Sequence, residues 1–402
     1  MEKRDFDRIV EITDDLAPEL KKLALDIHGN PEMGRKEFQA CKWQMGLLEK
    51  YGFETEANFC EIETSYKAVY KGTKPGPKIA MLAEYDALPE IGHACGHNLI
   101  AMISVGSGIV IKEFVDKYGG EIHVIGTPAE ETQGAKVEMS QKGAFKEYDV
   151  AMMAHPFEQN GSSINTMAVY ARRFEFFGKT AHAAASPHEG INALDAMINF
   201  FNMVNALRQQ TKPDARLHGV ILNGGVAPNI IPDYTEALFY VRGNKVAYVE
   251  ELLDKVIACA EGAAKGTGCT YKVSKAEEDF KDTDSNMVLS DLVCDQYEKL
   301  GHEILRAGRA VMPGSSDLGD VSYECPAVQL MCGMGPLAGG GHYGAHTVEF
   351  AQKACSSEAL ANGIEFVKAF AMTAVELLTD PSHLAAIKKE FETEKVDSIL
   401  PV

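Results

Sequence analysis

Three short segments of this sequence bring together side chains that bind metal ions. They are the segment with Cys95 and His97, the adjacent pair Glu130 and Glu131, and His155. Thiolate and imidazole groups favour Zn²⁺, and carboxylates extend the choice to Mn²⁺. A structural zinc ribbon is disfavoured because no second cysteine pair follows at the usual spacing. The pattern therefore predicts a divalent metal site that serves chemistry.

The two adjacent glutamates are expected to have separate roles, because consecutive side chains usually point apart. One can bind a metal ion while the other takes a proton from water that the ion has made acidic. Taken alone, the pair also fits a solvated acidic turn before a helix. Cys95 and His97 alone would equally fit a buried thiol beside a helix-capping histidine, or a thiol nucleophile with His97 or His93 as its base.

A glycine-rich segment near the C-terminus, residues 339–349, carries two further histidines, His342 and His346. Its glycines allow the backbone to approach a crowded site closely. No Lys-Ser or Lys-Thr follows the glycines, so a phosphate-binding loop is not indicated. Either histidine could complete a metal site, and the spacing does not choose between them.

The elements that must position these residues form an alternating pattern. Apolar runs at 78–83, 121–126 and 149–154 predict buried strands, and helical spacing is found at 6–28, 36–51, 99–117 and 137–142. Strands that alternate with helices predict a mostly parallel sheet covered on both faces. Ligands bind beyond the carboxyl ends of such strands, which is where the three segments lie.

The pattern changes between residues 167 and 280 and then returns. Within this stretch the order is strand, helix, strand, strand, helix, strand, which is typical of a ferredoxin-like α/β sandwich. We therefore expect a large catalytic domain made of residues 1–167 and 280–402, with a small domain, 168–279, inserted into it. The inserted segment carries His182, Asn229 and Arg242. Read from the residues alone, Asn229 and Arg242 also fit ordinary turn and hairpin chemistry.

Charge and cysteine content limit the class of protein. The 402 residues include 58 acidic and 39 basic side chains, a formal net charge of −19. Such an excess argues against nucleic acid or an anionic membrane as a partner. From the charged and mixed first residues we expect no signal peptide, and we expect no apolar run of the roughly 20 residues that span a bilayer. Nine scattered cysteines, an odd number, fit reduced thiols and a cytoplasmic protein.

Taken together, the motifs resemble the M20 family of metallopeptidases, in its amidohydrolase branch. Six motifs occur in the family's order across almost the whole chain: 93–97, 128–131, 155–156, 178–184, 229–232 and 346–350. Segments 92–99 and 313–322 are most similar to the group that contains p-aminobenzoyl-glutamate hydrolase and Xaa-Arg dipeptidase.

The resemblance implies a site for two divalent ions, zinc or manganese, and a role for each matching residue. The implied metal ligands are Cys95, His97, Glu131, His155 and His346. Glu130 matches the general base, and His182 matches a histidine that reaches a partner's active site and stabilises the oxyanion. Asn229 and Arg242 match groups that hold the substrate's carboxylate, with His342 as an accessory residue nearby. Asp86 matches a carboxylate that orients a ligand histidine.

The resemblance implies hydrolysis of an amide bond in an N-acyl amino acid, a dipeptide or an aminobenzoyl-glutamate-like conjugate that bears a carboxylate. It also implies a homodimer formed through the inserted lid domain. One departure concerns Asn98, since many members carry aspartate directly after the Cys-Gly-His sequence. A metal-binding homologue without activity is the alternative from another class, but no expected ligand or base is missing.

Overall fold

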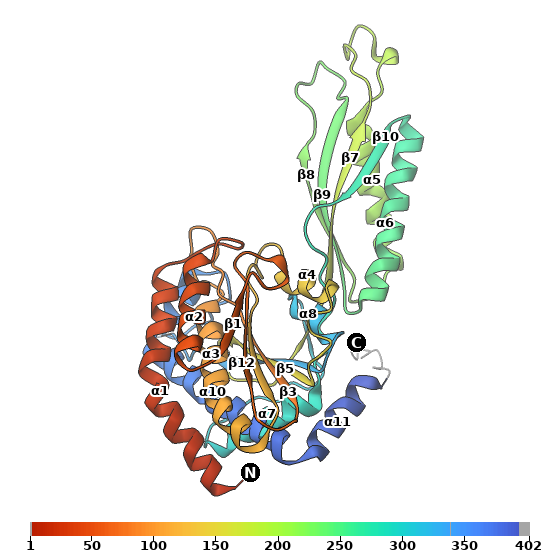
Figure 1. Ribbon diagram of the computed structural model, residues 1–402. Helices are drawn as coiled ribbons and strands as arrows, with labels where there is room; N and C mark the ends of the chain where they lie inside the picture. Colours follow the sequence, from red (N-terminus) through yellow and green to blue (C-terminus); the bar gives the residue numbers. More distant parts are fainter. Residues whose placement is uncertain (1, 338, 394–402) are drawn as a thin grey trace. The chain divides into compact units, whose positions relative to one another are not determined.

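The computed structural model describes residues 2–337 and 339–393, which form two units (Figure 1). The first unit contains residues 1–165, 283–312 and 317–402. The second contains residues 166–282 and the short segment 313–316. The expected insert, 168–279, falls within the second unit. The return of 313–316 to that unit had no signal in the sequence.

The first unit is built on a six-stranded sheet in the order β1-β2-β4-β3-β5-β12. Strands β4, β3, β5 and β12 run parallel, whereas β1 and β2 are antiparallel additions at one edge. The sheet is therefore mostly parallel, as expected. The bounds of its strands are β1 (Glu54–Ala57), β2 (Tyr66–Lys71), β3 (Lys78–Ala83), β4 (Glu121–Gly126), β5 (Val150–Phe157) and β12 (Ala327–Gly333).

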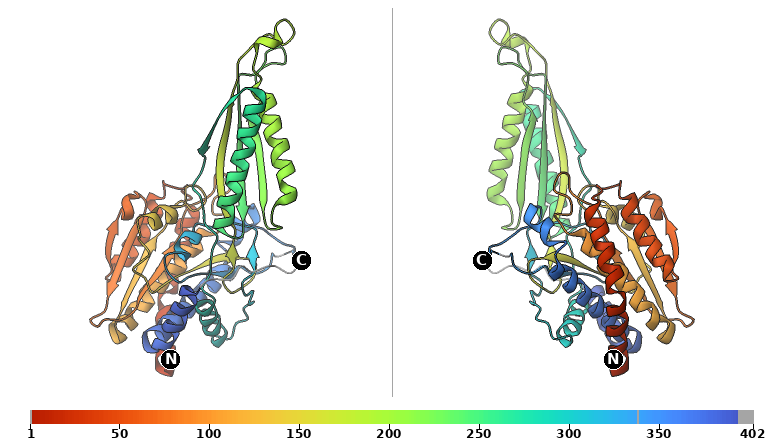
Figure 2. Two further views of the ribbon diagram at one scale, coloured as in Figure 1. Left: turned by 90° about the vertical axis from the view of Figure 1, so that its right-hand side faces the viewer. Right: turned by 90° about the vertical axis from the view of Figure 1, so that its left-hand side faces the viewer.

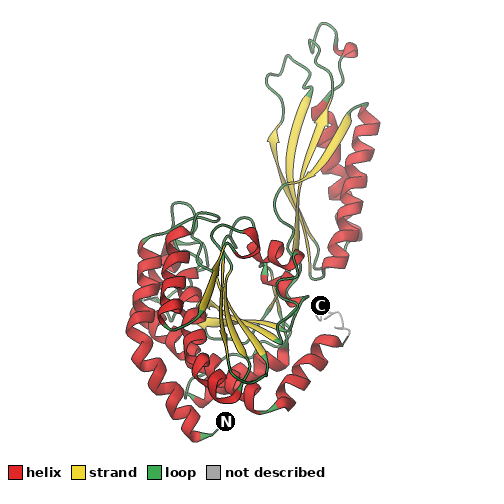
Figure 3. Ribbon diagram, in the orientation of Figure 1, coloured by secondary structure: helices red, strands yellow, loops and turns green. Residues whose placement is uncertain are grey.

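Both faces of this sheet are buried, which explains why its central strands are continuously apolar. In β3, Ile79 and Met81 pack into one core while Ala80 and Leu82 pack into a second core on the opposite face. Figure 3 shows the sheet between its helices. Their bounds are α1 (Lys3–Gly29), α2 (Phe38–Lys50), α3 (His97–Tyr118), α4 (Ala135–Gln141), α7 (Met287–Lys299), α8 (Leu318–Ser322), α9 (Val348–Lys353), α10 (Ser357–Thr379) and α11 (Pro381–Glu392).

Helix α3 is the one helix in the described part of the chain that is long and apolar enough to cross a membrane. The expectation that no apolar run approaches this length was therefore wrong for α3. However, 89% of its apolar window is buried inside the protein. Its apolar residues are explained by packing, because the sheet lies on one side of α3 and helices α1 and α10 lie on the other.

The second unit is a four-stranded antiparallel sheet in the order β10-β7-β9-β8. Helices α5 and α6 cover one of its faces (Figure 2) and bury a core that includes Phe174, Phe200 and Phe239. This is the expected ferredoxin-like arrangement. The bounds are β7 (Ala168–Phe177), α5 (Ala193–Leu207), β8 (Arg216–Asn223), β9 (Tyr234–Gly243), α6 (Val246–Thr267) and β10 (Thr270–Lys275). Strands β6 (Asn165–Thr166) and β11 (Val311–Met312) form a separate two-stranded sheet.

Candidate metal centre

Gly96 sets the geometry between Cys95 and His97. Its φ of +74° lies in the left-handed region, and a Cβ added there would lie 2.7 Å from Cγ of Pro156. Only glycine combines this backbone conformation with so close an approach. The turn ends the loop after β3 and starts α3 at His97, so the Cys95 and His97 side chains enter the same buried space.

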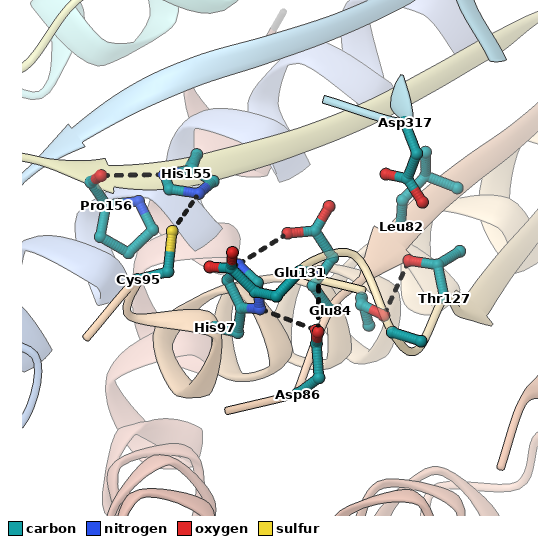
Figure 4. Close-up of polar contacts among 12 residues, drawn as sticks. Leu82, Glu84, Asp86, Cys95, His97, Thr127, Glu131, His155, Pro156 and Asp317 are labelled. Atoms are coloured by element: carbon teal, nitrogen blue, oxygen red, sulfur yellow. Dashed lines mark hydrogen bonds and ion pairs between the residues drawn. The ribbon is translucent and has the colours of Figure 1, made fainter. Parts of the chain in front are cut away.

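Two histidines present their Nε2 atoms to this space because their Nδ1 atoms are already engaged (Figure 4). His97 Nδ1 lies 2.8 Å from Oδ1 of Asp86, and His155 Nδ1 lies 2.9 Å from the carbonyl oxygen of Pro156. With the proton on Nδ1, each Nε2 carries a lone pair that can bind a metal ion. His97 Nε2 is buried and has no hydrogen-bond partner. We expected His155 to follow the third strand, which was predicted at residues 149–154. Instead, His155 lies within β5.

The candidate ligand atoms fall into three clusters in which all atoms lie within 4.8 Å of one another. One cluster contains Cys95, His97 and His155, and a second contains Cys95, Glu131 and His346. Because Cys95 belongs to both, its sulfur lies where one thiolate could bridge two ions. The third cluster joins His97 with Glu130 and Glu131. This donor set of thiolate, imidazole and carboxylate, with an orphaned His97 Nε2, fits borderline divalent cations.

Glu130 and Glu131 lie in the loop after β4. Two buried carboxylates fix this loop by accepting hydrogen bonds from its backbone amides. Asp86 accepts a hydrogen bond from the Glu131 amide at 3.0 Å, and Glu37 accepts one from the Ala129 amide at 2.8 Å. Ala129 has a φ of +61°, an uncommon conformation for a residue with a side chain. No sequence pattern pointed to the role of Glu37, because its partners come from distant parts of the chain.

The two glutamates have opposite pKa shifts. Burial and the neighbouring charge of Glu131 raise the pKa of Glu130 well above its usual range. Burial also opposes ionisation of Glu131, but its hydrogen bond to His346 and the charge of His97 outweigh this effect and lower its pKa. Glu131 therefore suits a metal ligand, whereas Glu130 holds a proton readily.

Burial raises the pKa of the Cys95 thiol well above its usual range. The thiolate is the form that attacks a substrate and also the form that binds a metal ion, so this shift does not separate the two roles. Cys95 Sγ lies 3.4 Å from His155 Nε2, inside the metal-ligand cluster. This position favours metal binding over the alternative in which Cys95 attacks the substrate.

A buried ion network beneath the centre was missed by sequence reasoning. Lys136 Nζ lies 2.6 Å from Oε1 of Glu84 and 2.6 Å from Oδ1 of Asp317, and all three side chains are fully buried. Glu84 directly follows β3, and Lys136 belongs to the buried face of α4. The sequence around Lys136 gave no signal of its burial, because the same short helix also carries Glu138 and Gln141.

His342 and Asn98 lie outside the clusters. His342 is 93% exposed and its Nδ1 lies 2.9 Å from Oε2 of Glu158. Asn98 is buried and donates hydrogen bonds to the backbone carbonyl oxygens of Ala24 and Ala354. Of the two histidines that the sequence left open, His346 joins a cluster, with its Nε2 3.2 Å from Oε1 of Glu131.

In the second unit, His182 and Asn229 lie close together, whereas Arg242 does not join them. His182 pairs with Ile230, and the Ala183 amide donates to the carbonyl oxygen of Asn229. Arg242 lies near the end of β9, and eight residue steps separate it from Tyr234 at the start of that strand, roughly 27 Å at about 3.4 Å per residue. Arg242 donates to Ser315 Oγ at 3.0 Å. Asn229 precedes β9, so Asn229 and Arg242 lie toward opposite ends of this strand, and their role in holding the substrate's carboxylate stays a prediction.

Comparison with known proteins identifies the family. Residues 170–267 match the model of a peptidase dimerisation domain of the M20 type. The whole chain is similar to the Xaa-Arg dipeptidase of Mus musculus, with 34% identity over 96% of this chain and 91% of the mouse protein. The chain belongs to the M20 family of metallopeptidases.

Further similarities place this M20 protein in the amidohydrolase branch. It is 33% identical to a p-aminobenzoyl-glutamate hydrolase polypeptide of Escherichia coli, over 62% of this chain and 56% of that protein. Its fold matches a crystal structure of a dinuclear metal-binding M20 peptidase from Bacillus subtilis, with a TM-score of 0.64 and 19% identity, covering 93% and 99% of the two chains. This M20 protein is a metallo-amidohydrolase, as the motifs had predicted.

Proposed function

We propose that this M20 amidohydrolase hydrolyses a small amide that carries a free carboxylate: an N-acyl amino acid, a dipeptide or an aminobenzoyl-glutamate-like conjugate. The observation that carries the proposal is the pair of ligand clusters that share Cys95, with Glu130 buried beside them. The similarity to an Xaa-Arg dipeptidase and to a p-aminobenzoyl-glutamate hydrolase supports this range of substrates.

In this proposal, five side chains would hold two divalent ions, Zn²⁺ or Mn²⁺. They are Cys95, which is common to two of the ligand clusters, His97 and His155 of one cluster, and Glu131 and His346 of the other. Asp86 fixes the ring of His97 through its 2.8 Å contact with Nδ1. Two such ions, when bound, lower the pKa of a shared water and polarise the substrate carbonyl.

Glu130 is the proposed general base. Its raised pKa suits a group that accepts a proton from the attacking water and then delivers that proton to the leaving amine. The general base must not itself bind the ions. The adjacent Glu131 supplies the carboxylate ligand, which leaves the carboxylate of Glu130 available for proton transfer.

His182 is the proposed donor to the oxyanion. Its Nδ1 accepts hydrogen bonds from the amides of Ala184 and Ala185, at 3.2 and 3.1 Å. The ring proton is therefore on Nε2, and this exposed atom can donate to the carbonyl oxygen as negative charge develops. One such donor commonly contributes about 3–4 kcal/mol to stabilising the transition state.

We propose a homodimer formed through the second unit. Strand β8 is an edge of its sheet and exposes three consecutive apolar side chains, Val220, Ile221 and Leu222. Such an edge favours pairing with another strand. The distance between Asn229 and Arg242 gives a second argument, because a dimer allows Arg242 of one chain and Asn229 with His182 of the other to contact one substrate.

The cytoplasm remains the proposed location. All nine cysteines fall within the described residues, and each of them is a free thiol. This state fits a reducing compartment.

The proposal is tested with a matched pair of variants, Glu130→Gln and Glu131→Gln, assayed with Mn²⁺ on p-aminobenzoyl-glutamate, basic dipeptides and N-acetyl amino acids. Glu130→Gln should retain two ions per chain and lose at least a thousandfold in kcat. Glu131→Gln should lose ion content as well as turnover. Near-native turnover of metal-loaded Glu130→Gln would overturn the assignment of the base. Failure of the wild-type protein to hydrolyse any of the three classes would overturn the proposed substrates.

A further inference from the structure

Glu84 divides its two carboxylate oxygens between different tasks. Oε1 accepts a hydrogen bond from Lys136 Nζ at 2.6 Å. Oε2 is buried and has no hydrogen-bond partner. A buried carboxylate oxygen without a partner is unfavourable unless something else neutralises it. The sequence and the proposed ligand set leave this oxygen unexplained.

The orphaned oxygen faces a second orphaned atom. Glu84 Oε2 lies 3.4 Å from His97 Nε2, and both side chains are fully buried. At this distance the two atoms are neighbours, yet their alignment does not make a hydrogen bond. Two donor atoms that each bind one ion at about 2.1 Å with a tetrahedral angle between them lie about 3.4 Å apart. The separation matches that of two ligands of one ion. Glu84 belongs to none of the three ligand clusters, so its Oε2 has to move closer to Cys95 and His155 when it binds the ion that they share with His97.

Lys136 and Asp317 hold Glu84 in this orientation. Asp317 accepts hydrogen bonds from both the backbone amide and the Nζ of Lys136, at 3.1 and 2.6 Å. Lys136 is thereby fixed at both ends of its side chain and pins Oε1 of Glu84. This leaves Oε2 as the only oxygen of Glu84 free to turn toward the ion. Figure 4 shows Glu84, His97 and Asp317 in this part of the centre.

We propose that Glu84 is a further metal ligand, which binds through Oε2 the ion that His97 binds, with Lys136 as its positioning residue. The inference rests on the proposed two-ion site and adds to it a carboxylate from the end of β3. It also gives the buried lysine a function, since Lys136 offsets the negative charge that Glu84 and Asp317 bring beneath the centre.

The test compares Glu84→Gln with the matched control Asp317→Asn. Both changes remove one carboxylate charge from Lys136 at fully buried positions, but only Glu84 faces His97. Metal-stripped full-length protein is titrated with Zn²⁺, and ion content is measured after dialysis. Glu84→Gln should weaken binding of one of the two ions at least tenfold, whereas Asp317→Asn should change it less than threefold. Both metal-free variants should show similar losses of thermal stability.

Visible spectra of Co²⁺-loaded protein provide a second measurement that does not depend on activity. Replacing a carboxylate ligand should change the Co²⁺ absorption of Glu84→Gln, while Asp317→Asn keeps the wild-type spectrum. Equal ion affinity in the wild-type protein and Glu84→Gln, or an unchanged Co²⁺ spectrum, would overturn the inference and leave the five-ligand site intact. A wild-type protein that binds no ion would instead overturn the proposed function itself.

Discussion

Asn98 illustrates, at the scale of one residue, how a position beside the metal centre serves packing. Its Nδ2 donates to Ala354 O at 2.9 Å and to Ala24 O at 3.4 Å, and its side chain is fully buried. It therefore ties the start of α3 to α1 and to the segment after α9. Aspartate, which many family members carry here, has no hydrogen to donate to these carbonyl oxygens.

Replacing Asn98 by aspartate is expected to destabilise the protein by about 2–3 kcal/mol, because a buried carboxylate would face two carbonyl oxygens. Calorimetry should show a midpoint lower by roughly 3 °C. Alanine at this position provides the control, since it removes the donors without adding charge and should cost less. An Asn98→Asp protein as stable as the wild type would show that the carbonyl oxygens find other partners.

At this scale, sequence reasoning found the residues whose types are chemically conspicuous. Cys95, His97, Glu131, His155 and His346 all lie in the clusters, because metal ligands belong to few residue types and strand ends bring them together. Glu84 and Lys136 were missed because carboxylates and lysines are common on protein surfaces. Their meaning comes from burial, which depends on the packing of α4 and β3.

At the scale of elements, the loop after β4 is the part of the structure that positions chemistry most directly. Glu37, at the start of α2, accepts hydrogen bonds from the Ala129 amide and from Thr64 Oγ1, both at 2.8 Å. Burial and the charge of Asp86 raise the pKa of Glu37 to about 7. The Glu37 side chain thus joins α2, the segment before β2 and the loop after β4.

We expect Glu37→Ala to lower kcat at least tenfold with little change in KM or ion content, because it releases the strained backbone directly before Glu130. Glu37→Gln keeps an oxygen that can accept from the Ala129 amide, so its kcat should fall less than threefold. Steady-state kinetics and metal analysis check both variants. Equal losses in the two would show that the charge of Glu37, and not its hydrogen bond, matters.

Most elements were predictable because their apolar spacing is clear. β3 and β4 have the predicted bounds, and the helices and strands of the second unit follow the predicted order. Strands β1, β2 and β12 were missed. The exposed pattern of β1 and the polar residues of β2 give weak alternation, since these strands lie at the sheet's antiparallel edge.

At the scale of the whole molecule, buried neutral histidines make stability depend on pH. Burial lowers the pKa of His93 to about 3 and that of His123 to about 4, from an ordinary value of 6.5. The unfolded chain binds protons at these groups below pH 6.5 and the folded chain does not. The stability they contribute is therefore complete above pH 6.5 and is lost as the pH falls toward 4.

Each histidine should reduce the free energy of unfolding by about 1.4 kcal/mol per pH unit in this window. His123 lies on β4, where its Nδ1 is 2.9 Å from the hydroxyl of Tyr148, so it can be changed without touching the ligand clusters. Between pH 6.5 and 5, the free energy of unfolding of His123→Gln should fall less than that of the wild-type protein. Calorimetry at several pH values measures both slopes. An identical slope in both proteins would contradict the assignment.

The interrupted first unit has a consequence for biosynthesis. Glu84 and four of the five ligands proposed for the two-ion site precede residue 156. His346 follows the whole second unit, and its backbone amide donates a hydrogen bond to the carbonyl oxygen of Ala94. During translation, Cys95, His97 and His155 are therefore available to one ion long before the second cluster can exist. Because β12 pairs with β5 and His346 comes later still in the sequence, the complete two-ion centre can form only after both have been synthesised.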